Sequence, residues 1–170
     1  MKRVKIILGI ISILVLVFFA TGAFIKQTTY TVQVQINKPI AQVFDAFNAI
    51  ENKQKWIPEL KSVEVVNENI GKTGSEYQLM IENQDQKMMI SEKIMAYIPN
   101  EKLTLFHNAE NMLKTNDYIF TESNGLTNIS LQATCTSDSY LMACLFPYFK
   151  GTFKNQDLSY LTNFKAFIEQ

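Results

Sequence analysis

The sequence predicts an α+β domain, a curved antiparallel β-sheet wrapped around a long C-terminal helix, preceded by one N-terminal transmembrane helix. Three observations lead to this prediction. Residues 6–25 form an uncharged, apolar run of 20 residues. Short segments with alternating apolar and polar side chains, separated by turn signals, fill residues 30–133, which is typical of strands. From residue 146 onward, aromatic residues recur at intervals of 3, 4 or 7 positions, which places them on one face of a helix.

Length and composition indicate one globular domain of ordinary size. The chain has 170 residues, of which 47% are hydrophobic, with 16 basic and 16 acidic side chains. These values exclude disordered, collagen-like and repeat architectures. A formal charge of zero argues against a nucleic-acid partner, because neutralising phosphates requires a basic excess. One histidine and two cysteines are too few for most zinc sites, and we predict no metal and no cofactor.

The uncharged run at residues 6–25 is predicted to cross the cell membrane, because 20 helical residues span about 30 Å, the thickness of the hydrocarbon layer. Three basic residues precede the run and only Lys26 follows soon after it. The positive-inside rule therefore places the N-terminus in the cytoplasm and residues 26–170 outside it. A cleaved signal peptide is the alternative, since small residues occupy positions 20–23. The length of the run favours a retained anchor over residues 1–25.

The first elements after the anchor are predicted to be a strand and a short helix. Residues from Tyr30 to Ile36 alternate between apolar and polar side chains, which predicts a half-buried strand. Apolar residues at positions 40, 43, 44 and 47 follow helical spacing, and Pro39 suits a first helical turn. A polar segment at 51–55 then leads to Pro58, where any second short helix must end.

Six further strands are predicted to follow as an antiparallel meander. Clusters of glycine, proline and asparagine separate the first five of them, at 71–74, 83–86, 99–100 and 108–111. These residues favour turns. Asn124-Gly125 is the strongest hairpin dipeptide in the chain. The predicted strands lie at Val63–Val66, Tyr77–Ile81, Met88–Tyr97, Leu103–His107, Tyr118–Thr121 and Thr127–Ala133.

The C-terminal segment is predicted to form a long amphipathic helix. Leu158, Leu161 and Ile168 widen its aromatic stripe into a broad apolar face. Pro147 is expected to mark an early turn or a kink, so the regular helix is expected to begin after it. The aromatic stripe consists of Phe146, Phe149, Phe153, Tyr160, Phe164 and Phe167.

This order of elements resembles the helix-grip fold of the SRPBCC superfamily, which includes START, Bet v 1-like, polyketide cyclase/dehydrase and lipid-transport proteins. The segments that carry the resemblance are Ile36–Ile40 with Val43-Phe44, Trp56 and Pro58 with Lys61–Glu64, Tyr97–Leu103, and Leu158–Glu169. Each motif is short, and their order over residues 29–170 makes the match specific. The resemblance implies a hydrophobic cavity between the sheet and the last helix. Its contents differ between members, so the fold does not determine the function.

One face of the predicted sheet carries large apolar side chains, and the long helix is expected to cover it. The 12 Phe, 7 Tyr and 7 Met of the chain suit an adaptable apolar cavity of roughly 300–1,000 Å³. The alternative is that these side chains simply fill a core. The candidate ligand-binding residues are Tyr77, Leu79, Met88, Ile90, Leu105, His107, Tyr118, Phe120, Leu131, Phe149, Phe153, Tyr160 and Phe164.

His107 is the one candidate for a catalytic residue. It shares strand parity with Leu105, which predicts an imidazole that points inward near the end of its strand. A general base also needs an orienting partner. Glu92 and Asp157 are the candidates, either for that role or for binding a polar group of a ligand. The alternative is that these carboxylates are solvated at the cavity mouth or hydrogen bond with Tyr118.

Cys135 and Cys144 flank the predicted turn from the last strand into the C-terminal helix. In an oxidising compartment a disulfide between them is one outcome. Two buried thiols that pack as small hydrophobic side chains are the other. Sequence spacing does not supply the distance between the two Cα atoms that would decide between these outcomes.

The sequence favours a non-catalytic, membrane-anchored domain that binds a small hydrophobic or lipid-like molecule. Anchoring raises the effective concentration of such a cavity near ligands dissolved in the membrane. Two alternatives remain open. One is a cyclase- or dehydratase-like enzyme in which His107 and a carboxylate or tyrosine move protons. The other is a protein-interaction module, because the resemblance extends to Hsp90-activator-like members, although an extracytoplasmic domain would not meet Hsp90.

Overall fold

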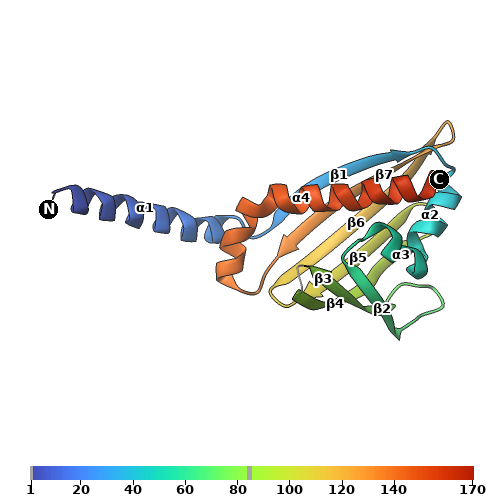
Figure 1. The fold of residues 1–170 in the computed structure, drawn as a ribbon, viewed down its shortest axis with the longest axis horizontal. Coiled ribbons are helices and arrows are strands. Elements are labelled where there is room, and N and C mark those ends of the chain that lie inside the picture. Colours follow the sequence, from blue (N-terminus) through green and yellow to red (C-terminus); the bar gives the residue numbers. More distant parts are fainter. Residues whose placement is uncertain (1, 84–85) are drawn as a thin grey trace.

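The computed structural model describes residues 2–83 and 86–170. It contains an N-terminal helix, seven strands, two short helices and a long C-terminal helix (Figure 1). The elements are α1 (Lys2–Phe24), β1 (Thr28–Ile36), α2 (Ile40–Asn48), α3 (Ile50–Trp56), β2 (Leu60–Asn67), β3 (Glu76–Asn83), β4 (Gln86–Ile98), β5 (Lys102–Ala109), β6 (Met112–Ser123), β7 (Leu126–Thr136) and α4 (Tyr140–Ile168).

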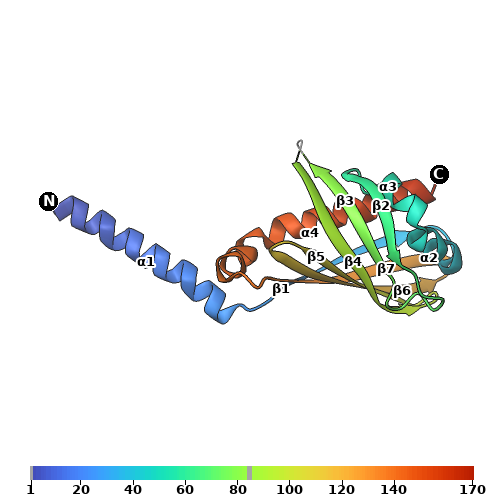
Figure 2. The same cartoon turned by 90° about the horizontal axis from the view of Figure 1, so that it is seen from below.

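The seven strands form one antiparallel sheet in the order β1-β7-β6-β5-β4-β3-β2. After β1, each strand pairs with the next along the chain, and β7 closes back onto β1. Figure 2 shows β2, β3 and β4 turned up along one side of α4, so the sheet curves around this helix. Figure 1 shows α2 and α3 at the end of the sheet that lies farthest from α1. The predicted α+β architecture is confirmed.

The alternation predicted for the first strand is observed in β1. Tyr30, Val32 and Ile36 are buried, while Thr31 and Gln33 are exposed. Val32 pairs with Leu131 of β7, and both side chains pack into the core. A strand with one face in the core and one in water explains this period of two.

The turn between β6 and β7 is formed by the predicted hairpin dipeptide. Asn124 and Gly125 have φ angles of 53° and 74°, the left-handed values that a two-residue hairpin with matching twist requires. Ser123 pairs with Leu126 across this turn. The β3–β4 turn predicted at 83–86 includes residues 84 and 85, which lie outside the described residues.

The β5–β6 hairpin differs from the prediction. The expected turn at 108–111 is shorter, because β5 continues to Ala109 and pairs there with Met112. The strand predicted at Tyr118–Thr121 instead begins at Met112. Its first half is rich in lysine, asparagine and aspartate, residue types that are disfavoured in strands, and pairing on both sides overrides that preference.

The C-terminal helix also differs from the prediction. It begins at Tyr140 and contains Pro147 in its interior, whereas regular helix was expected only after the proline. Figure 1 shows the orange N-terminal part of α4 bent away from the red remainder, as an internal proline favours. The predicted apolar face of this helix is also not continuous. Phe149 is 48% exposed and Leu158 is 40% exposed, so neither lies on the buried face.

The short helices α2 and α3 close one end of the core through aromatic packing. Phe47 of α2 contacts Trp56 of α3, Phe120 of β6 and Phe164 of α4, with ring centroids 5.0–5.5 Å apart. Edge-to-face and offset pairs at these separations stabilise a core beyond simple burial. This cluster fills the space at one end of α4, so any cavity must lie nearer its middle.

The helix α1 extends away from the domain (Figures 1 and 2). Among the described residues it is the one helix long and apolar enough to cross a membrane. Its C-terminal end contacts the beginning of α4, where the Tyr140 hydroxyl donates a hydrogen bond to the carbonyl of Phe19 at 2.6 Å.

Cys135 and Cys144 are both buried and free.

Candidate ligand cavity

A cavity of about 780 Å³ lies between the concave face of the sheet and the helices α3 and α4. This volume falls within the range of small-molecule sites. The strands β3 to β6 supply most of its wall, and Gln156, Asp157 and Tyr160 of α4 supply the opposite side. Its apolar wall includes Phe47, Trp56, Leu79, Ile81, Met88, Ile90, Leu103, Leu105 and Met112.

The cavity brings together eight of the thirteen candidate ligand-binding residues. These are Tyr77, Leu79, Met88, Ile90, Leu105, His107, Tyr118 and Tyr160. The other five lie elsewhere. Phe120, Leu131 and Phe164 are fully buried core side chains, Phe153 packs against Phe146, and Phe149 is half exposed. A ligand contact remains a prediction for the eight residues that line the cavity.

A row of polar side chains crosses the sheet at the cavity wall. Glu92 of β4 pairs with His107 of β5, and His107 pairs with Lys114 of β6. In antiparallel strands, directly opposite residues point to the same face. An acid, an imidazole and an amine therefore stand side by side on three adjacent strands.

Glu92 contacts both a lysine of α3 and the histidine of this row. Its side chain is 3% exposed, and it forms an ion pair with Lys53 of α3 through Oε1. His107 Nε2 lies 3.0 Å from Glu92 Oε2. Burial alone would raise the pKa of Glu92, but the adjacent Lys53 and His107 outweigh burial and lower this pKa to about 2. Glu92 is therefore an ionised carboxylate at neutral pH.

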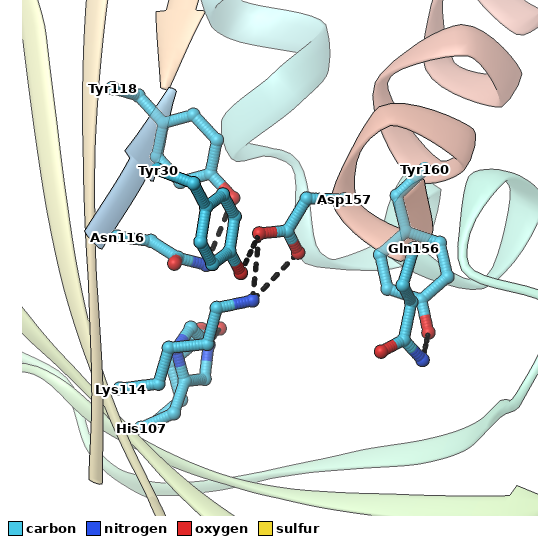
Figure 3. A network of polar contacts seen from close by, with 9 residues as sticks. Tyr30, His107, Lys114, Asn116, Tyr118, Gln156, Asp157 and Tyr160 are labelled. Atoms are coloured by element: carbon cyan, nitrogen blue, oxygen red, sulfur yellow. Dashed lines mark hydrogen bonds and ion pairs between the residues drawn. The ribbon is translucent and has the colours of Figure 1, made fainter. Parts of the chain in front are cut away.

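Asp157 of α4 binds the lysine at the other end of this row and a tyrosine of β1 (Figure 3). Lys114 Nζ lies 2.6 Å from Asp157 Oδ1 and 2.9 Å from Oδ2, and the Tyr30 hydroxyl donates to Oδ2 at 2.7 Å. Burial and the neighbouring carboxylate raise the pKa of Tyr30, so its hydroxyl stays protonated. The expectation that Asp157 would orient His107, pair with Tyr118 or remain solvated is wrong, while contact with a polar group of a ligand remains a prediction, because Asp157 lines the cavity. It is 4% exposed and binds Tyr30 and Lys114.

Asn116 follows Lys114 by two positions on β6, on the same face of the sheet, and is 5% exposed. Its Nδ2 donates to the Tyr118 hydroxyl at 3.3 Å (Figure 3). Its Oδ1 and the Nδ1 of His107 are buried and have no hydrogen-bond partner within residues 2–83 and 86–170. Both residues line the cavity. An unpaired buried polar atom is costly, so these two atoms are the least satisfied part of the polar row.

Sequence reasoning missed four residues of this polar network, Tyr30, Lys53, Lys114 and Asn116. Lys114 and Asn116 share parity with Tyr118, which was a usable signal, but they precede the segment predicted as a strand. Tyr30 was placed on the correct face without a polar partner. Lys53 lies in a short polar helix, and nothing in its sequence context distinguishes it from a solvated lysine.

The polar side chains at the cavity wall are balanced in charge. In the part of the chain that the structure describes, no group of three or more His, Cys, Asp or Glu side chains comes together as a metal-ligand set. The two carboxylates are each paired with a lysine. The cavity therefore combines an apolar wall with a charge-balanced polar row, and its lining residues Trp56, His107 and Asn116 each carry a buried polar atom without a partner among the described residues.

No family model matches the chain, and no curated protein matches it. Solved structures do match. Ara h 8.0201 superposes with a TM-score of 0.71 at 17% identity, covering 84% of this chain and 97% of that protein. The Zhui aromatase/cyclase from Streptomyces sp. R1128 has a TM-score of 0.72 at 10% identity, covering 84% and 94%. A conserved protein from Geobacillus kaustophilus has a TM-score of 0.70 at 13% identity, covering 83% and 95%.

At these identities the likeness concerns the fold. The matching structures share the antiparallel sheet and the long C-terminal helix. The chain therefore has the helix-grip fold that its sequence predicts, a curved antiparallel sheet around a long C-terminal helix.

Proposed function

We propose that this protein is a membrane-anchored domain that binds a small, mostly apolar molecule carrying one hydrogen-bonding group. The observation that carries the proposal is the pairing of a cavity of about 780 Å³ with three lining residues, Trp56, His107 and Asn116, that each carry a buried polar atom without a partner among the described residues. Apolar surface supplies affinity for such a molecule, and a few placed polar groups orient it.

The polar group is best matched by a hydroxyl. Asn116 Oδ1 can only accept a hydrogen bond, so its partner must be a donor. Because Nε2 of His107 donates to the ionised Glu92, Nδ1 accepts a hydrogen bond in the neutral imidazole and donates one in the imidazolium, and a hydroxyl serves either case. The lysines of the row are already paired with carboxylates, which argues against a free anion as the main recognised group. An aliphatic or isoprenoid alcohol represents this class.

The anchor supports the same proposal. Residues 6–25 are uncharged, and three basic residues precede them, which favours a cytoplasmic N-terminus and an extracytoplasmic domain. A reporter fused after Gln170 tests this orientation. Activity of a reporter that works only in the cytoplasm would reverse it.

The only tryptophan of the chain provides a direct test of binding. Trp56 lines the cavity, so a brominated ligand bound there quenches its fluorescence. The full chain in lipid nanodiscs is titrated with dibromo-octadecanol and with its methyl ether, which cannot donate a hydrogen bond. We expect saturable quenching, with the alcohol binding more tightly than the ether. Absence of saturable quenching by both compounds would overturn the proposal.

Two adjacent positions on β4 give a matched control. Ile90 lines the cavity, whereas Met89 is 43% exposed and does not line it. Ile90→Phe narrows the cavity and is expected to weaken binding of dibromo-octadecanol. Met89→Phe adds a similar side chain outside it and is expected to leave binding unchanged. Equal effects of the two substitutions would place the bound probe outside the cavity.

A second candidate function is proton-transfer catalysis, which the His107–Glu92 contact favours. A carboxylate 3.0 Å from one ring nitrogen orients the imidazole, as a general base requires, and the other nitrogen is buried without a partner among the described residues. One protein of the same fold is an aromatase/cyclase. His107→Gln is compared with the unaltered protein on a ketide-like substrate. Turnover that is lost on substitution while the melting temperature is kept supports this candidate, and unchanged turnover removes it.

A further inference from the structure

The first ten residues of α4, Tyr140–Phe149, form an unusual segment for the surface of a domain. They are YLMACLFPYF, without a charged side chain, between Asp138 and Lys150. We call this segment the α4 head. Its bend relative to the rest of α4 (Figure 1) turns it away from the axis of the cavity-lining part of the helix. The head is therefore a distinct apolar element beside the anchor.

Much of the apolar surface of the α4 head is uncovered within the chain. Tyr140, Leu141, Tyr148 and Phe149 are 52%, 51%, 59% and 48% exposed. Scattered apolar residues on a surface are ordinary, but a group of large ones in one segment marks a surface that meets a partner or a membrane. The position of the group relative to α1 decides between these partners.

The α4 head packs directly against the C-terminal part of α1. The ring of Tyr140 stacks on Phe19 with centroids 6.2 Å apart, and Tyr148 stacks on Phe18 at the same separation. The Tyr148 hydroxyl lies 2.9 Å from Thr21 Oγ1. These contacts fix the head laterally against α1.

Gly22 permits the close approach of the two helices. A Cβ at this position would lie 2.3 Å from Cys144 Sγ, which is a steric clash. Small residues at such points let helix backbones approach each other, as in membrane helix pairs. The contact between the α4 head and α1 is thus specified by the shape of both segments.

The level of these contacts along α1 places the head in the bilayer. The uncharged run of α1 ends at Ile25, and Phe18 and Phe19 precede that end by six to seven residues. At 1.5 Å per helical residue, this is a depth of about 10 Å. Apolar interfacial helices bury their apolar face about 5–10 Å into the lipid, and tyrosine side chains are enriched at this level.

We propose that the α4 head is inserted into the same membrane leaflet as the C-terminal end of α1, with Leu141 and Phe149 in contact with lipid. The proposal rests on the membrane anchoring proposed above. Its consequence is that the domain does not swing freely on its anchor. The bilayer holds α4, and with it the cavity between α4 and the sheet, in one orientation relative to the lipid surface.

The test uses tryptophan fluorescence of the full chain in nanodiscs whose phosphatidylcholine is either brominated or unbrominated. Leu141→Trp and Phe149→Trp report on the head, and Ile70→Trp, at a fully exposed position between β2 and β3, is the aqueous control. The signal of Trp56, which is 5% exposed, is measured in the unaltered chain and subtracted. We expect brominated lipid to cause about a two-fold loss of emission from the head positions and none from the control.

A fourth variant, Leu16→Trp in the uncharged run, separates the two proposals. If it is quenched while both head variants behave like Ile70→Trp, the anchor stands and the insertion of the head is overturned. If Leu16→Trp is not quenched, anchoring and insertion are both overturned. Head variants with blue-shifted but unquenched emission would mean that protein, such as a second copy of the chain, covers the head, and this also overturns insertion.

Discussion

His107 Nε2 lies 3.0 Å from Glu92 Oε2, and the two residues are direct cross-strand partners on β5 and β4. The other carboxylate oxygen of Glu92 pairs with Lys53 of α3. One buried carboxylate therefore connects the sheet to a short helix and orients the only histidine of the sequence at the cavity wall. The polar row therefore has a structural role, and the first predictions concern this role.

Replacing Glu92 by glutamine is expected to destabilise the protein strongly. The substitution leaves the Lys53 ammonium buried without a counter-charge. Breaking a buried ion pair from one side costs about 3–5 kcal/mol in the free energy of unfolding. Urea denaturation followed by circular dichroism measures the change.

Glu76→Gln is the matched control. Like Glu92, Glu76 of β3 is paired with a lysine, here Lys93 of the neighbouring strand β4. The side chains of Lys93 and Glu76 are 44% and 38% exposed, and solvent screens such pairs. We expect Glu76→Gln to change stability by less than about 1 kcal/mol. Similar effects of the two substitutions would show that burial of Glu92 does not strengthen its role.

Acid is expected to destabilise the protein through Glu92. The pKa of Glu92 is about 2 in the folded chain, against an ordinary value of 4.5. The unfolded chain therefore binds the proton more readily. The stabilisation from this group is complete above about pH 4.5 and is lost as the pH falls toward about 2. Urea denaturation at a series of pH values measures the slope.

The same pH series on Glu92→Gln identifies the source of that slope. Without the carboxyl group, stability between pH 4.5 and 2 should depend less on pH than in the unaltered protein, since one proton-linked group is missing. Parallel slopes for the two proteins would mean that other carboxylates cause the acid sensitivity. Lowered stability of the variant at neutral pH does not affect this comparison of slopes.

Tyr30→Phe is expected to lower stability by about 1.5–3 kcal/mol, because its hydroxyl donates to the buried carboxylate of Asp157 at 2.7 Å. Lys114 remains bound to Asp157 in this variant, so the charge stays paired. Tyr160→Phe removes an exposed hydrogen bond with Gln156 at 2.8 Å and is expected to cost about 0.5–1 kcal/mol. Thermal unfolding of the two variants compares the costs, and a smaller loss for Tyr30→Phe would contradict the network.

Gly125→Ala tests the hairpin that joins β6 and β7. Gly125 has a φ of 74°, and a Cβ there would meet no atom within 4 Å. Any loss therefore comes from the left-handed backbone and is expected to be about 1–2 kcal/mol. Gly71→Ala, which also meets no atom within 4 Å and does not have a positive φ, should be close to neutral. Equal unfolding midpoints in urea would refute this reason for the glycine.

Local patterns predicted most of the elements. The alternation in β1, the helical spacing in α2 and the Asn124-Gly125 hairpin are confirmed. The errors have physical causes. Polar residues hid the first half of β6, because its strand state depends on pairing with β5 and β7. Helix continues through Pro147, since packing of α4 on β1 and α1 compensates for the lost backbone hydrogen bond.

The sequence predicted which face of the sheet lines the cavity, but it did not predict the polar contacts between the side chains on that face. Strand parity placed Tyr77, Leu79 and Leu105 at the cavity wall, because side chains alternate strictly along a strand. Parity does not tell which polar side chains meet across the cavity. Tyr30 and Asp157 are 127 positions apart. They come within hydrogen-bond distance only because α4 packs against the sheet.

The sequence by itself determined the helix-grip order of elements, the apolar anchor-like helix and the face of the sheet that lines the cavity, because these follow from hydrophobic periodicity within single segments. The tertiary structure alone decided which residues form the polar row, where the cavity ends and which surface of α4 lies against α1. Those outcomes depend on distances between segments remote in the chain, which are set by strand register, by the curvature of the sheet and by the bend in α4.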